Sequence, residues 1–203
     1  MKHNADIGLF TDPSTLISAI NATVDEQQYW EKQRMAVIDK FLGKTVEIPE
    51  DRRYDTKQDL WGKKVDRTIL FGLTQPALVL LGGVKDLDWL LEEGQLVQPG
   101  ESAAFAITGK ILYIDTPVAG TIHYNKIARK NPTVVSNDPY GEGWLFMIQP
   151  DSDIDQAYQS LVTAAQYVES LRTSEGFKNP EGIKGGVSGI CKAVYSGIGR
   201  QKI

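Results

Sequence analysis

The side chains that most often do covalent or acid–base chemistry are scarce in this chain. Its 203 residues include one cysteine, Cys191, and two histidines, His3 and His123. Zinc sites with four cysteines, or with two cysteines and two histidines, are therefore excluded, as are a CxxC redox pair and an internal disulfide. A catalytic triad would have to be built on His123, because His3 lies at the terminus, and no G-x-S-x-G elbow supplies a nucleophile. We therefore do not expect an enzyme.

Neither His123 nor Cys191 belongs to a recognisable constellation. His123 lies in the alternating run Gly-Thr-Ile-His-Tyr, which predicts a strand with Ile122 and Tyr124 on the opposite face. We interpret it as a structural or surface histidine. Cys191 is followed by Lys192, a neighbour that lowers the pKa of some thiols, but a lone cysteine near a terminus is more often inert.

A lysine is the side chain whose setting points to chemistry. Two β-type runs, 102–108 and 111–115, flank Thr108-Gly109-Lys110 and predict a hairpin with Lys110 at or near its tip. Thr116-Pro-Val-Ala-Gly-Thr-Ile122 follows, in which we expect Pro117 to end one strand and Gly120 to form a turn before the next. Carrier domains present a modified lysine on such a tip, because an exposed amine on a rigid hairpin lets one prosthetic group visit several active sites. An ordinary turn lysine is the commoner alternative.

Charge and hydropathy limit the partners. The chain has 22 Lys and Arg against 26 Asp and Glu, a net charge of −4, which argues against nucleic acid or an anionic membrane as the main partner. No segment approaches the roughly 18 apolar residues of a membrane span. The first residues lack the apolar stretch of a secretory signal and the Arg/Ser richness of a transit peptide. We expect a cytoplasmic protein.

The elements that must position Lys110 are mostly strands. Residues of about 52–150 form short β-type runs separated by Gly, Pro, Asn and Asp, with one short helix expected at 75–81. This spacing is typical of a sandwich or a small barrel. The pattern on its own therefore predicts a small β core with terminal helices.

Helical patterns dominate both ends of the chain. We expect one helix to begin at Asp12-Pro13 and a second, carrying Trp30, Val37 and Phe41, to end at Gly43. A third, amphipathic helix is expected from Ser152 to about residue 171, before a Gly-rich basic tail. The predicted organisation is a helical extension at 1–50, a main domain at 51–172 and a Gly-rich basic extension at 173–203. The extensions either pack on the main domain or dock a partner.

The motif at 131–150 is the most specific in the chain. Asn131-Pro-Thr-Val-Val-Ser-Asn-Asp-Pro-Tyr-Gly-Glu-Gly-Trp-Leu-Phe-Met-Ile-Gln-Pro150 resembles the signature N-P-x-L-V-N-x-x-P-Y-G-x-G-W-[LIF]-x-[KR]-[IL] of the H protein of the glycine cleavage system, a lipoyl carrier. Thr116-Pro-Val-Ala-Gly-Thr-Ile122 is similar to the same family. Tyr54-Asp-Thr-Lys-Gln-Asp-Leu-Trp61 and the segment 71–82 match more weakly. The resemblance covers about 52–172. It implies a mainly β barrel-sandwich hybrid, like a lipoyl domain, with added terminal helices, which carries lipoate and binds partner enzymes.

The sequence departs from this family at the lipoyl site. The family places its lysine in E-[ST]-x-K-A, eight residues before the proline of A-P-x-x-G. Counting back from Pro117, that position is Gly109, whereas Lys110 lies seven residues before it. The acidic residue three positions earlier is also missing, with Ala106 or Ile107 in its place. We therefore favour an H protein-like relative that binds partner enzymes without a lipoyl arm. The alternative is a lipoyl carrier that uses Lys110 to move an aminomethyl group, a sulfur species or electrons.

Overall fold

The computed structural model describes residues 35–183 of the chain. The chain divides into two compact units, residues 1–35 and 36–203. The helix predicted at Asp12-Pro13 and the residues around Trp30, Cys191 and the basic tail after Lys184 lie outside the described residues. No helix within 35–183 is long and apolar enough to cross a membrane.

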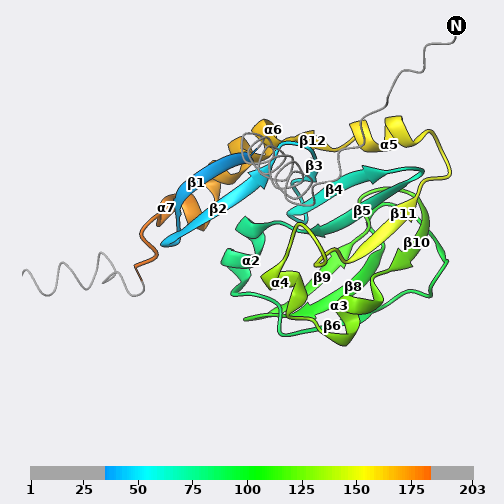
Figure 1. Ribbon diagram of the computed structural model, residues 1–203, viewed down its shortest axis with the longest axis horizontal. Coiled ribbons are helices and arrows are strands. Elements are labelled where there is room, and N and C mark those ends of the chain that lie inside the picture. The colour runs from blue at the N-terminus through cyan, green and yellow to red at the C-terminus, as the bar shows by residue number, and fades with distance from the viewer. Residues whose placement is uncertain (1–34, 184–203) are drawn as a thin grey trace, which may run out of the picture. The chain divides into compact units, whose positions relative to one another are not determined.

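Two antiparallel sheets form the core of the second unit (Figure 1). All neighbouring strands of the larger sheet pair antiparallel. Buried residues of both sheets belong to one hydrophobic core, in which Phe71 and Ile122 join Ala104 and Ile114. This open sandwich confirms the predicted mainly β architecture. In order across the larger sheet, the strands are β12 (Val162–Thr163), β3 (Arg53–Asp55), β4 (Leu60–Val65), β5 (Thr68–Leu73), β11 (Phe146–Gln149), β10 (Gly120–Tyr124) and β7 (Leu96–Val97).

The smaller sheet contains the hairpin predicted to display Lys110. Its three strands are β6 (Asp86–Trp89), β8 (Ser102–Ile107) and β9 (Ile111–Asp115), with β8 in the centre. Because side chains alternate between faces, the rows Leu87–Ala106–Leu112 and Trp89–Ala104–Ile114 face the core, whereas the rows Asp86–Ile107–Ile111 and Asp88–Phe105–Tyr113 face outward. Burial follows the same alternation, since Ala104, Ala106 and Ile114 are buried.

A second cluster of aromatic side chains covers the end of the larger sheet. The rings of Tyr54 and Tyr167 stack with centroids 4.6 Å apart, and the Trp61 indole donates a hydrogen bond to the carbonyl of Pro139 (2.8 Å). The Arg52 guanidinium lies 4.5 Å from the centroid of the Trp61 ring. This cluster joins β3 and β4 to α6 (Ala164–Ser170).

The helix predicted at 75–81 is confirmed as α2 (Gln75–Leu81). Thr74 caps its start, because its Oγ1 accepts a hydrogen bond from the N–H of Ala77 (3.2 Å). Gly82 ends it in the left-handed conformation, with φ 77°. Two short helices, α3 (Lys126–Lys130) and α4 (Val134–Asn137), follow β10 and precede β11.

The helix predicted to end at Gly43 is wrong over the described residues. Its last part forms strand β1 (Met35–Phe41), which pairs in a two-stranded hairpin with β2 (Lys44–Pro49). Leu42 and Gly43 make the turn with φ of 54° and 75°, a conformation that continues neither a helix nor a strand. Along β1 the half-buried Ala36 and Ile38 alternate with the exposed Val37 and Asp39, and this period of two competes with the helical spacing of the apolar residues.

The single helix predicted from Ser152 to residue 171 is also wrong. The chain forms α5 (Ile154–Gln159), strand β12 and then α6, followed by the 3₁₀ turn η1 (Leu171–Thr173) and α7 (Glu175–Lys178). One distant contact and one local cap break the helix. The Arg53 guanidinium donates to the carbonyl of Leu161 (3.0 Å), and Thr163 begins a new helix through a reciprocal capping box with Gln166.

The turn predicted at Gly120 is corrected as well, because Gly120 is the first residue of β10. Its φ is 147°, and a Cβ added there would lie 2.2 Å from the carbonyl oxygen of Gln149. Only a residue without a side chain permits β10 to approach β11 this closely. The predicted end of a strand before Pro117 is confirmed, since β9 ends at Asp115.

Candidate functional site

The hairpin tip predicted to present Lys110 is the three-residue connection between β8 and β9. Ile107 and Ile111 form the last cross-strand pair, and Thr108, Gly109 and Lys110 close the turn. The N–H of Thr108 donates to the carbonyl of Lys110 (2.8 Å), and Thr108 Oγ1 accepts from the N–H of Lys110 (3.1 Å). Thr108 is buried, whereas Gly109 and Lys110 are exposed. The predicted exposed lysine at the tip is therefore confirmed.

The tip is held against the last residue of α2 and the segment that follows it. The N–H of Gly109 donates to the carbonyl of Leu81 (3.1 Å), and the N–H of Lys85 donates to the carbonyl of Ile107 (2.8 Å). A hairpin fixed at its apex positions anything attached there precisely. Two main-chain hydrogen bonds thus tie the tip of the hairpin to its neighbours.

Gly109 occupies the apex without a structural need for glycine. A Cβ added there would have one neighbour, the carbonyl oxygen of Leu81 at 3.5 Å, which is ordinary van der Waals contact. Its φ is outside the left-handed region that favours glycine. The fold would therefore accept a side chain, lysine included, at residue 109.

The surroundings of the tip do not reproduce the attachment site of a lipoyl-lysine. The apex lacks an amine, and of the two positions where an acidic residue would precede it, Ala106 is buried on the inner face and Ile107 is an apolar side chain on the outer face. Lys110 offers an exposed amine one residue further on, and among residues 35–183 it forms no ion pair. That residue 109 carries no lipoyl group therefore stays a prediction.

His123 has the surface role predicted for it. Its Nδ1 lies 2.9 Å from Oε1 of Glu93, while Oε2 of Glu93 accepts from the N–H of Tyr124 (3.0 Å). Burial opposes ionisation of Glu93, but these hydrogen bonds and the nearby imidazole outweigh it and lower the pKa of the carboxyl. Ile122 and Tyr124 are buried on the opposite face, as the alternation predicted.

No group of three or more His, Cys, Asp or Glu side chains in the described part of the chain is placed to hold a metal ion. The one cysteine, Cys191, is outside that part.

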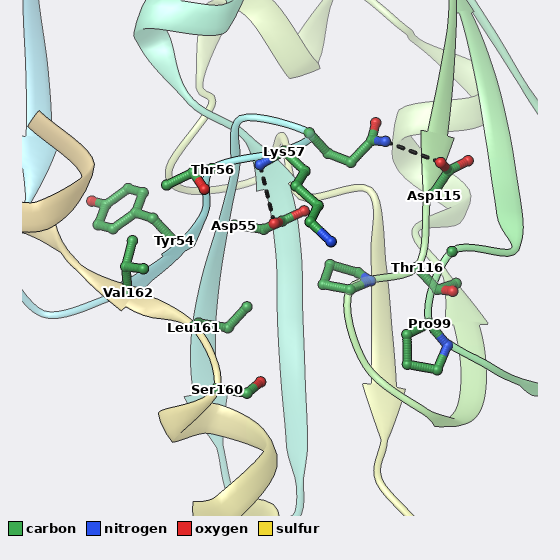
Figure 2. A pocket seen from close by; sticks show the side chains of 13 residues that line it. Tyr54, Asp55, Thr56, Lys57, Pro99, Asp115, Thr116, Ser160, Leu161 and Val162 are labelled. Atoms are coloured by element: carbon green, nitrogen blue, oxygen red, sulfur yellow. Dashed lines mark hydrogen bonds between the residues drawn. The ribbon is translucent and has the colours of Figure 1, made fainter. Parts of the chain in front are cut away.

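A pocket of about 440 Å³ lies at the other end of β9 from the tip. Figure 2 shows the Lys57 side chain extending between the segment that follows β3 and the proline-containing turns opposite. Asp115 closes one wall, because its carboxylate accepts from Gln58 Nε2 (3.0 Å) and Ser102 Oγ (2.6 Å). At about 3.4 Å per strand residue, Asp115 is roughly 17 Å from Lys110.

Sequence reasoning missed this pocket, although it had singled out Tyr54–Trp61 for its resemblance. The run Asp55-Thr-Lys-Gln58 was a usable signal, since three adjacent polar residues, Thr56, Lys57 and Gln58, interrupt a β pattern. The pocket is lined by Tyr54, Asp55, Thr56, Lys57, Gln58, Pro99, Gly100, Asp115, Thr116, Pro117, Ser160, Leu161 and Val162.

Comparison with known proteins assigns most of this unit to one family. A model of the family "Glycine cleavage H-protein" matches residues 52–174. The glycine cleavage system H protein of a Thermus thermophilus strain is 38% identical over 132 residues, which cover 63% of this chain and 98% of that protein. The H protein of Bifidobacterium longum is 33% identical over 129 residues, covering 63% of this chain and 90% of that protein.

A solved structure agrees with these matches. The crystal structure of a glycine cleavage system H protein from Mycobacterium marinum has a TM-score of 0.52 and 30% sequence identity, and the alignment covers 60% of this chain and 97% of that one. The family match spans β3 to η1 and includes the β8–β9 hairpin, while β1 and β2 precede it.

Proposed function

Because the chain belongs to the glycine cleavage H-protein family, we propose that it is a partner-binding member whose β8–β9 hairpin has no lipoyl arm. Family membership makes it a non-enzymatic protein of the carrier type, as the sequence predicted. The proposed partners are enzymes that recognise the H-protein surface around the hairpin tip. We place the protein in the cytoplasm on its sequence alone.

One observation supports the absence of an arm more than any other. The apex residue Gly109, where the family has its lysine, lies in a position that would accommodate a side chain. A glycine that the fold required would say nothing about function. A glycine that the fold does not require needs another explanation. Loss of lipoylation is a sufficient explanation, because a chain that carries no lipoyl group has no use for a lysine at this position.

Binding is then the activity that the hairpin retains. Its backbone is fixed by the bonds from Gly109 to Leu81 and from Lys85 to Ile107, so its shape would be the same with or without a prosthetic group. Lipoate supplies a reactive dithiolane when a carrier holds it, and this chain would hold it only through Lys110. The exposed amine of Lys110 at the tip favours that second candidate, a lipoyl carrier.

The mass of the intact protein tests the proposal. The chain would be expressed in cells supplied with lipoate, together with the Thermus thermophilus H protein as proof that lipoylation works there. We expect the wild-type chain to have its unmodified mass. A Gly109→Lys/Lys110→Arg variant puts a lysine at the family position, and its lipoylation would show that the hairpin itself suits the attaching enzyme.

The opposite result is equally clear. An added lipoyl mass on the wild-type peptide that contains Lys110, lost in a Lys110→Arg variant, would establish the carrier and overturn the arm-less proposal. The conservative Arg substitution keeps the positive charge, so a change in mass reports the modification and not a change in folding.

A further inference from the structure

A second pocket, of about 590 Å³, lies at the end of β6 that is farther from the hairpin tip. β6 runs from Asp86, which pairs with Ile107 at the tip, to Trp89, which pairs with Ala104. Small-molecule sites are usually cavities of roughly 300–1,000 Å³. The pocket lies outside the hairpin on which the proposed function depends. Its lining residues are Trp89, Leu91, Glu92, Glu93, Tyr124, Lys126, Arg129 and Lys130.

Two stacked aromatic rings form one surface of this pocket. The rings of Trp89 and Tyr124 have centroids 4.4 Å apart and planes inclined by 15°. The Tyr124 hydroxyl donates to the carbonyl of Ala103 (3.1 Å), which holds its ring in place. Tyr124 is buried and covers one face of the indole, whereas Trp89 is only half-buried and also borders the pocket. An indole supported in this way is a preformed platform for another planar ring.

A basic face of α3 forms a second surface, because this helix packs against β6 (Figure 1). Lys126, Arg129 and Lys130 are spaced i, i+3 and i+4, so they share one face of the helix. Arg129 Nη2 pairs with Oδ1 of Asp88 (3.0 Å), which ties α3 to β6. Lys126 and Lys130 are exposed and form no ion pair with any residue of 35–183. Since like charges four residues apart destabilise a helix, these two lysines favour an anionic group beside them.

The segment after β6 adds two carboxylates, which differ in their partners. Both oxygens of Glu93 are engaged, one with His123 Nδ1 (2.9 Å) and the other with the N–H of Tyr124 (3.0 Å). Glu92 is exposed, and its carboxylate pairs with no cation of the described chain. A free carboxylate accepts hydrogen bonds only, so it favours a ligand that also carries N–H donors.

We propose that this pocket binds a nucleotide. The base stacks on Trp89 and donates N–H groups to Glu92, and the phosphate lies beside Lys126 and Lys130. A nucleotide combines the three features that the lining asks for, namely a planar ring, N–H donors on that ring and an anionic group. A simple aromatic acid would leave Glu92 without a donor, and inorganic phosphate would leave the indole uncovered.

Isothermal titration calorimetry of the full chain with adenosine monophosphate (AMP) tests the proposal. We expect saturable binding with a dissociation constant below about 1 mM. Adenosine lacks the phosphate and inorganic phosphate lacks the base, so each should bind at least about tenfold more weakly than AMP. Failure of AMP to bind below about 1 mM overturns the proposal. Adenosine or inorganic phosphate binding as tightly as AMP overturns it as well.

Substitutions assign the base and the phosphate to their contacts. Trp89→Leu keeps an apolar side chain without the ring and should weaken AMP binding at least about fivefold, whereas Trp89→Phe should retain most of it. Lys126→Gln and Lys130→Gln should each weaken the binding of AMP but not of adenosine. Lys178→Gln is the matched control, because Lys178 is exposed at the end of α7, outside the pocket. Circular dichroism checks the fold of each variant. AMP binding that is unchanged in Trp89→Leu and in both pocket lysine variants overturns the proposal.

A second ligand tests the contact between the base and Glu92. Glu92→Ala should weaken the binding of AMP, whose exocyclic amine is a donor, and should leave purine riboside monophosphate, which lacks that amine, unaffected. Equal losses for the two ligands would overturn the assigned orientation of the base. Naphthoate, an aromatic carboxylate without N–H donors, should bind more weakly than AMP. Tighter binding of naphthoate, or a pocket occupied by a segment of another protein and closed to AMP, would overturn the assignment to a nucleotide.

Discussion

Gly109, at the tip of the β8–β9 hairpin, and Gly120, at the start of β10, are glycine for different reasons. At Gly120 a Cβ would meet the Gln149 carbonyl oxygen at 2.2 Å, and the backbone has φ 147°. At Gly109 the nearest atom would be 3.5 Å away, and φ is outside the left-handed region. The first glycine is required by strand packing. The second is not required by the fold.

The same contrast separates the rest of the family-like motif from the hairpin tip. In the run 131–150, a Cβ at Gly141 would lie 2.3 Å from Oδ2 of Asp138, and one at Gly143 would lie 2.5 Å from the Asp138 carbonyl oxygen. Those glycines let the chain close around Asp138. The motif therefore reflects a shape that the fold needs, whereas the fold has no such need for glycine at residue 109.

Of the substitutions that test this contrast, Gly120→Ala should lower the free energy of unfolding the most. The added Cβ would overlap backbone atoms of β11, which cannot rotate away as a side chain can. We expect the free energy of unfolding to fall by about 3 kcal/mol or more. Urea denaturation of the variant measures this. A loss below about 1 kcal/mol would mean that the strands separate easily, and the contrast with Gly109 would fail.

Asp59→Asn should have an effect on stability between those of the two glycine substitutions. Asp59 has φ 53°, which asparagine also tolerates, and its Oδ1 accepts from the hydroxyl of Tyr167 (2.9 Å). Burial raises the pKa of this carboxyl above 3.8, so the folded state prefers the protonated form. The Asp59 carboxyl therefore makes its full contribution to the free energy of unfolding at a pH below its pKa in the unfolded chain. That contribution is lost as the pH rises through its pKa in the folded chain.

The neutral asparagine avoids that loss and keeps the oxygen acceptor. We expect the free energy of unfolding to rise at pH 7, and this gain to disappear at pH values below the pKa of the carboxyl in the unfolded chain. Thermal melts of both proteins across this pH range measure it. A difference that is constant with pH would show that the charge of Asp59 is not responsible.

Gly109→Ala should have the smallest effect. The Cβ meets only ordinary contacts at an exposed apex, so we expect the free energy of unfolding to change by less than about 0.5 kcal/mol. The urea experiment used for Gly120→Ala provides the direct comparison. A loss comparable to that of Gly120→Ala would make Gly109 a structural glycine and remove the main support for the arm-less proposal.

Local patterns predicted the elements whose signals lie within a few residues. The cap Thr74, the stop Gly82 and the apolar residues between them are enough to specify α2. The β8–β9 hairpin and the surface position of His123 were likewise predictable from alternation and turn residues. The resemblance at 116–150 supplied the sandwich architecture, which the β pattern alone left open.

Two segments were mispredicted because distant contacts decide them. The expected helix after residue 152 is interrupted where Arg53, far earlier in the chain, bonds to the Leu161 carbonyl. The described end of the helix expected up to Gly43 is instead strand β1, which pairs with β2. A short apolar run with mixed spacing suits either element, and tertiary packing selects one of them.

The amino-acid sequence by itself determined that the chain has one cysteine and two histidines, which family the segment of about 52–172 resembles, and that Gly109 stands where that resemblance leads us to expect a lysine. Those conclusions depend only on residue types and their order. Tertiary structure alone decided that Gly109 has room for a side chain and that Trp89 and Lys130 line one pocket. The space around a residue and the lining of a pocket depend on atoms remote in sequence, such as the Leu81 carbonyl beside Gly109, so no local pattern encodes them.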